Sequence, residues 1–340
     1  MKMHEQLAFI LVGDHLGQVK KVLPDTGEIS SLVGCAAPCR SNPVVSIESI
    51  GEQSMQLIAN KNGDLYIYDC IHDTIKSCHK VDDDLIKALP LSAKQVFLIY
   101  AKRVSLEGRG EFIKQKKGNI CNAKAVDNKL ALVGKDIPLK IFDIQTRQKI
   151  YEADPPEKDW LGIRPEVYVS GLDFLARDKA ATCSKSDSVI RVYDTLSKSK
   201  PVISVDISQT AFNEHADSSR FLSIASTGDD GHSVVVGSNV GQILAIDLRF
   251  NVKHLPKKKL QPRNHKILGG FKGARGASIK DIKLVQANLG GDSDGYKVIS
   301  CCLDRYLRIH NFTRQSRQLN KHFYMTTKPF CCSPVFYHGA

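Results

Sequence analysis

Short runs of alternating hydrophobic and polar residues recur along this chain, and the run from Asp304 to Asn311 shows the pattern most clearly. A polar turn residue opens it, and apolar residues then occupy every second position, Leu307 and Ile309. Successive side chains of a β-strand point to opposite faces. The run therefore predicts a tight turn followed by a strand with one buried face.

The same frame occurs upstream in several copies. In three copies the opening and closing polar residues are seven positions apart: Asp136–Asp143, Asp187–Asp194 and Asp304–Asn311. Two looser copies place Gly six positions before a closing Asp, Gly63–Asp69 and Gly241–Asp247, and an eroded copy covers 17–23. The apolar positions expected to share one face are Leu65, Leu139, Ile190, Ile243 and Leu307, followed by Ile67, Ile141, Val192, Ala245 and Ile309. One hairpin cannot bury both of its faces, whereas stacked neighbours can, so the frame predicts a repeat protein.

The spacing of the closing residues gives the number of repeats. Asp143 and Asp194 are 51 residues apart and Asp194 and Asp247 are 53 apart, whereas 74 residues separate Asp69 from Asp143. The long gap predicts a further repeat, with strands at 88–91, 96–100 and 109–115. Seven repeats of roughly 40–50 residues with four strands each are typical of a β-propeller. The expected fold is therefore all-β, a seven-bladed propeller formed by residues 1–340 as a single domain.

The ends of the chain indicate how such a ring closes. The first repeat begins with what should be its second strand, and the apolar segment 330–336 follows the last strand, expected near 323–326. We expect this segment to supply the innermost strand of the N-terminal blade, which would cover exposed strand edges. No apolar run approaches the ~18–20 residues of a membrane span. The polar start, 1–6, has no signal-peptide core, so a cytosolic or nuclear protein without membrane contact is expected.

Basic residues are clustered as well as numerous. The net charge is +12, and the stretch 253–275 holds eight Lys or Arg and no Asp or Glu. Such clustering predicts a polyanionic partner, most commonly RNA, and a solvated loop or a nuclear-import signal is the alternative. Lysine and arginine bind phosphates with release of counterions. The predicted contact residues are Lys257, Lys258, Lys259, Arg263, Lys272 and Arg275.

Two further residues are predicted to meet a partner protein. Trp160 and Arg164 lie in a stretch too polar to be core, and such residues often anchor interfaces. The alternative for Trp160 is that it caps a blade. Three basic residues on repeat strands, Lys140, Arg191 and Arg308, are expected to be structural.

Motifs for catalysis or metal binding are weak. Gly291–Gly295 matches G-x-S-x-G, but that motif needs a strand-to-helix turn, and an apolar strand, 296–300, follows it here. The glycine-rich stretch 269–278 lacks the phosphate-loop pattern, which leaves either a backbone approach to an rRNA phosphate or a plain loop between blades. Cysteine and histidine at 70, 72, 78 and 79 fit no standard zinc spacing. We predict no catalytic residues, no metal and no cofactor.

The ten cysteines do not indicate disulfides. Cys301, Cys302, Cys331 and Cys332 form adjacent pairs within apolar runs, and neighbours on a strand point to opposite faces. We therefore expect buried free thiols in a reducing compartment.

The closing residues carry a family resemblance. Asp143, Asp194 and Asp247 stand where WD-repeat proteins have the Asp of their name-giving dipeptide, with Phe, Tyr or Ile in place of the Trp and without the usual Gly-His pair. The repeats are therefore degenerate. Several stretches resemble the WD repeat-containing protein 74 family, nucleolar assembly factors of the large ribosomal subunit precursor: 188–194, 236–243, 246–249, 271–279 and 303–310, with 159–175 also fitting.

The resemblance implies a function. Such a protein is a non-catalytic scaffold in biogenesis of the large (60S) subunit, present in the nucleolus as a monomer within a large ribonucleoprotein. It docks on pre-ribosomal particles beside other assembly factors and pre-rRNA, and a remodelling ATPase of the AAA class releases it. Family members carry a Lys-rich tail after the propeller, and this sequence ends at Ala340 without one. The alternative is a peptide-binding propeller adaptor, such as a ubiquitin-ligase substrate receptor or a histone reader.

Overall fold

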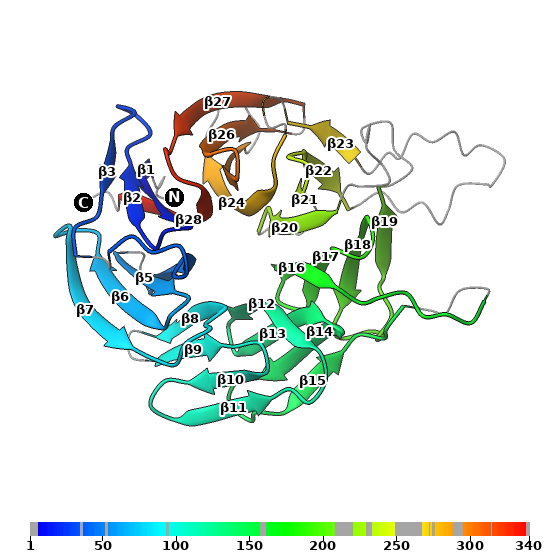
Figure 1. Cartoon of the computed structure of the whole chain (residues 1–340). Helices are drawn as coiled ribbons and strands as arrows, with labels where there is room; N and C mark the ends of the chain where they lie inside the picture. The colour runs from blue at the N-terminus through cyan, green and yellow to red at the C-terminus, as the bar shows by residue number, and fades with distance from the viewer. Residues whose placement is uncertain are drawn as a thin grey trace, which may run out of the picture.

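The chain forms a ring of antiparallel sheets (Figure 1). The computed structural model describes residues 6–34, 37–51, 54–92, 95–156, 161–207, 220–228, 233–248, 267–271, 273, 276–287, 295–313 and 315–337. These residues contain seven four-stranded sheets and no helix. Consequently no helix in the described ranges could cross a membrane. The expected all-β, seven-bladed propeller is confirmed.

Each blade has four strands, given in order from the inner strand to the outer strand. Blade 1 consists of β28 (Pro329–Tyr337), β1 (Gln6–Asp14), β2 (Val19–Val22) and β3 (Ile29–Ser31). Blade 2 consists of β4 (Val44–Ile50), β5 (Met55–Asn60), β6 (Asp64–Asp69) and β7 (Thr74–Lys80). Blade 3 consists of β8 (Lys87–Ser92), β9 (Gln95–Ile99), β10 (Arg103–Leu106) and β11 (Gly110–Lys114). Blade 4 consists of β12 (Asn119–Val126), β13 (Lys129–Lys135), β14 (Ile137–Asp143) and β15 (Lys149–Glu152).

The remaining blades follow the same order. Blade 5 consists of β16 (Val169–Ala176), β17 (Lys179–Ser184), β18 (Val189–Asp194) and β19 (Ile203–Asp206). Blade 6 consists of β20 (Phe221–Ser226), β21 (Ser233–Ser238), β22 (Ile243–Asp247) and β23 (Ile267–Gly270). Blade 7 consists of β24 (Ile279–Ala287), β25 (Gly295–Cys302), β26 (Tyr306–Phe312) and β27 (Arg317–Tyr324).

The repeated frame forms the turn between the second and third strands of a blade, together with the third strand. The first apolar position of the frame is fully buried in all five clear copies, and the second is buried in four, while Ile67 is half-buried. Seven apolar clusters form among the described residues, one at each interface between neighbouring blades. The core therefore lies between the sheets, which is why one hairpin unit alone would not be stable.

The polar residue that opens the frame fixes the turn. Asp187 accepts a hydrogen bond from the backbone N–H of Val189 at 3.2 Å and pairs with Arg191 at 2.6 Å. Asp304 does the same with the N–H of Tyr306 at 3.0 Å and with Arg308 at 2.5 Å. Arg191 and Arg308 are thus structural, as expected. So is Lys140, which pairs with Glu152 at 3.4 Å.

In the two looser copies a glycine stands one position after the opening position of the frame, where the backbone of the next interblade connection packs on the turn. Gly63 and Gly241 both have φ +85°, a conformation that costs glycine little. A Cβ atom at either position would lie closer than 3.0 Å to a backbone oxygen, that of Val81 or Ala277. The two looser frame copies therefore follow from this close approach.

The C-terminal segment closes the ring. β28 pairs antiparallel with β1, from Leu7 opposite Phe336 to Asp14 opposite Pro329. The hypothesis that the end of the chain supplies the innermost strand of the first blade is confirmed (Figure 1).

Two expected elements need correction. The hidden repeat exists as blade 3, but its strand β10 was missed because Arg103–Leu106 carries only two apolar residues between two turns. The strand expected near 323–326 is instead β27, Arg317–Tyr324, which lies at the outer edge of its blade. Its residues are mostly polar, so the hydrophobic pattern revealed only its end.

Candidate functional site: the central channel

A β-bulge near the start of the inner strand turns one side chain of most blades toward the centre of the ring. The pairing register skips one residue at this point in six of the inner strands, and a bulge re-aims the skipped side chain. These residues and Ile86, directly before β8, line a cavity of about 210 Å³ at one end of the channel. We call them the entrance ring: Val45, Ile86, Cys121, Ser170, Leu222, Lys280 and Phe330.

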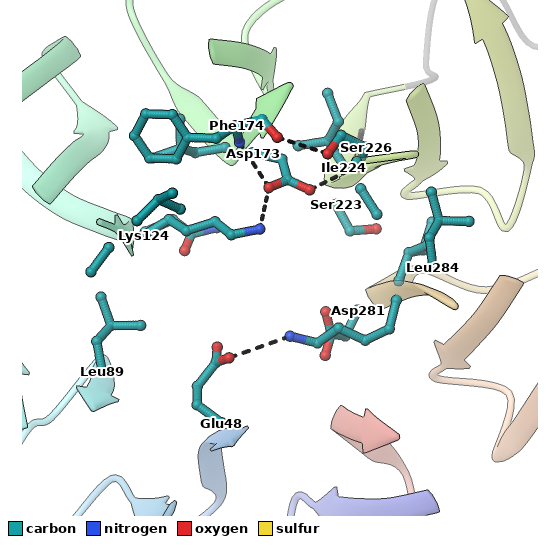
Figure 2. Close-up of a pocket in the computed structure, with 18 of the residues that line it drawn as sticks. Glu48, Leu89, Lys124, Asp173, Phe174, Ser223, Ile224, Ser226, Asp281 and Leu284 are labelled. Carbon is teal, nitrogen blue, oxygen red and sulfur yellow. Dashed lines mark hydrogen bonds and ion pairs between the residues drawn. The ribbon is translucent and has the colours of Figure 1, made fainter. Parts of the chain in front are cut away.

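Beyond the entrance ring the channel widens into a cavity of about 800 Å³. Its lining alternates apolar side chains such as Leu89 and Leu284 with charged ones such as Lys124 and Asp173 (Figure 2). The charged residues at its centre come from inner strands. Neighbouring blades are closest here, so their side chains reach one another across the ring.

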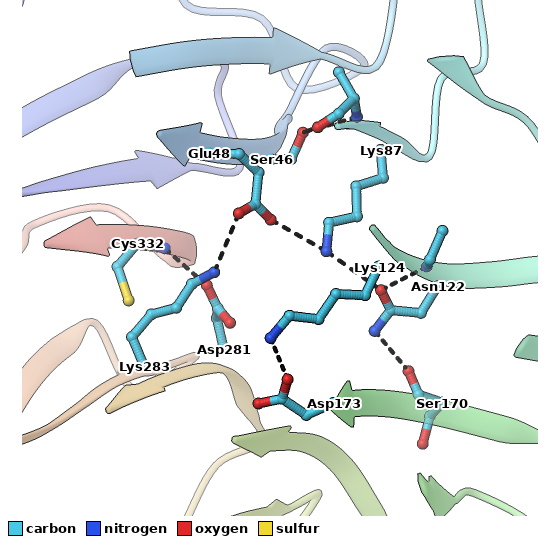
Figure 3. A network of polar contacts seen from close by, with 12 residues as sticks. Ser46, Glu48, Lys87, Asn122, Lys124, Ser170, Asp173, Asp281, Lys283 and Cys332 are labelled. Carbon is cyan, nitrogen blue, oxygen red and sulfur yellow. Dashed lines mark hydrogen bonds and ion pairs between the residues drawn. The ribbon is translucent and has the colours of Figure 1, made fainter. Parts of the chain in front are cut away.

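Glu48 on β4 is the centre of one charged group. Its carboxylate lies 3.1 Å from Lys87 Nζ on β8 and 3.7 Å from Lys283 Nζ on β24 (Figure 3). Burial alone would raise the pKa of Glu48, but Lys283, Lys87 and Lys124 together lower it to about 2. Glu48 therefore stays ionised at neutral pH and links three blades.

Asp173 on β16 is the centre of a second group. One carboxylate oxygen pairs with Lys124 of β12, and the other accepts the backbone N–H of Ser226 at 2.8 Å. Asp281 on β24 accepts the backbone N–H of Cys332 on β28 at 3.0 Å. These contacts join blades 4, 5 and 6 (Figure 2), and blade 7 to blade 1 (Figure 3).

The ionisable groups of the channel are held in fixed protonation states by their surroundings. In the described part of the chain, no group of three or more His, Cys, Asp or Glu could hold a metal ion. Cys331, which borders the entrance, is buried, and this burial raises its thiol pKa well above the usual value, so it stays protonated. Fixed, ionised side chains at the wall of a cavity can orient a charged ligand.

Most of the residues predicted for partner contact lie outside the described residues. These are Trp160, Lys257, Lys258, Lys259, Arg263, Lys272 and Arg275. Arg164 is exposed between β15 and β16, beside a cavity of about 630 Å³ whose rim includes Glu152 and Glu166. The predicted contact roles of all eight residues stay predictions.

The weak motifs are placed in part. Residues 291–294 lie outside the described ranges, but Gly295 begins β25, so a strand and no helix follows the G-x-S-x-G stretch. His72 contacts Asp69 at 2.8 Å, and Cys78 is exposed. All nine described cysteines are free, and Cys183 and the four in adjacent pairs are buried as expected.

The charged channel was not predicted from the sequence. Its residues are polar positions within strands that mix apolar and polar residues, as Glu48 and Ser49 stand between Ile47 and Ile50. Polar residues at equivalent positions of successive inner strands were the available signal. That comparison requires strand alignments which eroded repeats do not supply.

The closed ring of four-stranded blades defines the chain as a β-propeller protein, and four of its third strands end on an Asp as WD repeats do. In sequence it is 29% identical over 205 residues to WD repeat-containing protein 74 of Bos taurus and of Homo sapiens, and 28% identical over the same length to that of Mus musculus. The matches cover 59% of this chain and 44% of each relative. The chain thus spans less than half of the length of the curated relatives it matches. The resemblance to the WD repeat-containing protein 74 family is confirmed.

Other comparisons add only the fold. No protein-family model matches the chain. The crystal structure of the computationally designed Ika8 protein superposes with a TM-score of 0.60 at 13% sequence identity, covering 96% of this chain and 87% of that protein.

Proposed function

We propose that the protein is a scaffold in biogenesis of the large ribosomal subunit, acting in the nucleolus without catalysing a reaction. The similarity to WD repeat-containing protein 74 carries the proposal, because the resemblance to that family implies assembly of pre-ribosomal particles. The propeller supports it, since a rigid ring with free loops fits a scaffold. Assembly factors, pre-rRNA and an AAA-type remodelling ATPase are the partners that this proposal names.

The basic stretch 253–275 supports contact with RNA. It accounts for eight of the 48 Lys and Arg in the chain and contains no acidic residue. Along the chain it runs from the connection between β22 and β23, through β23, into the connection between β23 and β24. Phosphates of pre-rRNA are the polyanion that the proposed function provides.

Charge reversal tests this contact. Changing Lys257, Lys258, Lys259, Lys272 and Arg275 to Glu should reduce crosslinking to pre-rRNA at least ten-fold while leaving the thermal transition unchanged, because none of the five belongs to a strand of the described blades. Reversal of Lys116 and Lys117, which are exposed between β11 and β12, is the matched control and should have little effect. A loss of the same size per reversed charge in both variants would mean that net charge alone matters.

Affinity purification of the wild-type protein tests the function itself. Large-subunit precursor RNA and assembly factors are expected. A cullin adaptor or nucleosomes in their place would overturn the ribosomal assignment and favour a peptide-binding adaptor.

A further inference from the structure

The connection between β15 and β16 is long and projects from the ring. It spans 16 residues, 153–168, whereas six residues join β7 to β8 and four join β11 to β12. Its described parts run outward past the edge of the ring (Figure 1). Two large apolar side chains on it, Leu161 and Ile163, are 60% and 61% exposed. Large apolar side chains exposed on a projecting segment favour contact with another protein.

A cavity of about 310 Å³ opens at the base of this connection, at the seam between blades 4 and 5. We call it the seam pocket, and its apolar lining includes Pro138, Pro155, Val167, Tyr168, Tyr193 and Pro201. Tyr193 is buried in the core between these blades, and Tyr168 is half-buried. Tyrosine rings and prolines give the pocket stiff walls, and its volume falls within the range of about 300–1,000 Å³ that is typical of binding pockets.

Two carboxylates without a cationic partner lie beside the seam pocket. The second cavity at this seam, of about 630 Å³, adjoins the pocket, because Asp154, Pro155 and Val167 line both. Asp136 and Asp154 are exposed at it, and neither forms an ion pair within the described ranges. Asp154 accepts a hydrogen bond from the Ser199 hydroxyl at 2.6 Å, which orients its carboxylate. Both charges stay uncompensated although the chain carries a net charge of +12.

The charges around this second cavity favour a basic occupant. Its other carboxylates are already paired, Glu166 with Lys135 at 3.6 Å and Glu152 with Lys140 at 3.4 Å. Among the described lining residues only Arg164 is basic, so two unpaired carboxylates face one cation. Phosphates are repelled by such a surface, whereas a Lys or Arg of a protein gains an ion-pair partner. The occupant that fits is a protein segment with a basic residue beside an apolar one.

We propose that the seam pocket and the projecting connection form a docking surface for a partner protein, which inserts an aromatic side chain into the pocket and places a neighbouring Lys or Arg against Asp136 and Asp154. Aromatic rings pack well against one another edge to face, and single aromatic anchors in such pockets carry much of the binding energy of an interface. Leu161 and Ile163 extend the apolar contact along the connection. The inference does not depend on the proposed function, since it identifies the partner by its chemistry alone.

Selection from a peptide library tests the proposal without an identified partner. A random 12-residue phage-displayed library is selected on the immobilised propeller and counter-selected on Val167→Trp, whose indole fills the seam pocket. A parallel counter-selection uses the Asp136→Asn, Asp154→Asn variant, whose exposed substitutions leave the core intact. The recovered peptides should carry an aromatic residue close to a Lys or Arg. Absence of this enrichment overturns the proposal.

Affinity measurements on a recovered peptide then locate each contact. Fluorescence anisotropy should show roughly five-fold weaker binding to the Asp136→Asn, Asp154→Asn variant, because two exposed ion pairs are lost. Changing the aromatic residue of the peptide to Ala should weaken binding about ten-fold or more.

Asp127→Asn is the matched control and should bind as the wild type does. Asp127 and Asp136 are both exposed turn residues of blade 4, but they lie at opposite ends of β13. Both have a positive φ, +51° and +57°, which Asn tolerates as Asp does. The control therefore removes a turn carboxylate from the same blade without touching the seam.

Three outcomes would contradict the assignment. Equal affinity of the wild type and the Asp136→Asn, Asp154→Asn variant would leave these carboxylates without a role in docking. Binding of a ten-residue oligouridine that Val167→Trp abolishes would assign the seam to RNA. Self-association in analytical ultracentrifugation that Val167→Trp abolishes would assign it to a second copy of the chain.

Discussion

Single acidic residues perform different tasks in this ring according to their position on the strand. At the frame positions, Asp187 and Asp304 satisfy backbone N–H groups of their own turns. At the closing position, Asp143 and Asp194 cap the next turn by accepting the N–H groups of Thr146 and Leu196, at 2.7 and 3.0 Å. Glu48 instead reaches two other blades. The first two roles are local and recur, whereas the third depends on the closed ring.

The role of Glu48 predicts a pH-dependent stability. Its folded-state pKa of about 2 lies below the ordinary 4.5. Its contribution is therefore complete above about pH 4.5 and is lost as pH falls through about 2. Glu48→Gln should lower the free energy of unfolding at pH 7 by about 3 kcal/mol. Urea denaturation of both proteins between pH 7 and pH 3 should show this difference shrinking below pH 4.5.

The control is a carboxylate with a comparable partner but greater exposure. Glu166 lies 3.6 Å from Lys135, and 55% of its side chain is exposed. Glu166→Gln should change stability by less than about 1 kcal/mol. A loss of stability as large as that of Glu48→Gln would mean that the contacts of Glu48 across the ring stabilise the protein no more than an exposed ion pair does.

At the scale of elements, the hairpin frame forms the blades and β28 closes the ring. Ile10 and Val12 on β1, and Cys332 on β28, belong to the cluster between blades 7 and 1. Phe9 and Leu11, and Val335 of β28, belong to the cluster between blades 1 and 2. Removing β28 would thus open two interfaces and leave β1 as an unpaired edge.

Deletion of residues 328–340 should therefore abolish the cooperative thermal transition or cause aggregation. Differential scanning calorimetry and size-exclusion chromatography measure both effects. Deletion of 338–340 alone leaves β28 intact and should have no effect, and a synthetic peptide spanning 328–340 should partly restore the transition of the longer deletion. A monomeric deletion variant with an unchanged melting temperature would contradict this role of β28.

At the scale of the whole molecule, the charged side chains form two groups: one is paired within the channel, and the other is exposed. Within the channel, positive charges meet carboxylates across blade boundaries. The channel carboxylates thus offset these lysines, whereas the stretch 253–275 carries eight of the basic residues behind the net charge of +12 and no acidic residue. Under the proposed function, this surplus attracts phosphates.

Such binding should depend on salt. If the five charges reversed in the crosslinking test each contact a phosphate, log Kd for single-stranded RNA should rise with log salt with a slope of about 3.5. The reversed variant should show a nearly flat dependence. Titrations between about 50 and 300 mM KCl measure the slope, and salt-independent binding of the wild type would rule out the phosphate contacts.

The sequence by itself determined the repeat, the number of blades and the strand that closes the ring. These depend on the alternation of buried and exposed residues and on turn residues such as Asp187 and Gly63, which act within a few positions along the chain. Strands with few apolar residues, such as β10 and most of β27, escaped because their partners rather than their own pattern specify them.

Only the tertiary structure decided what faces the centre. Glu48, Lys283 and Lys280 are polar residues of ordinary sequence context, and their roles arise where strands 39 to 235 residues apart in the chain meet around the axis. Ion pairs act between groups that are close in space, so their existence depends on ring closure and on the bulges that set side-chain direction. The hydrophobic periodicity of a single repeat encodes neither the ring closure nor the bulges.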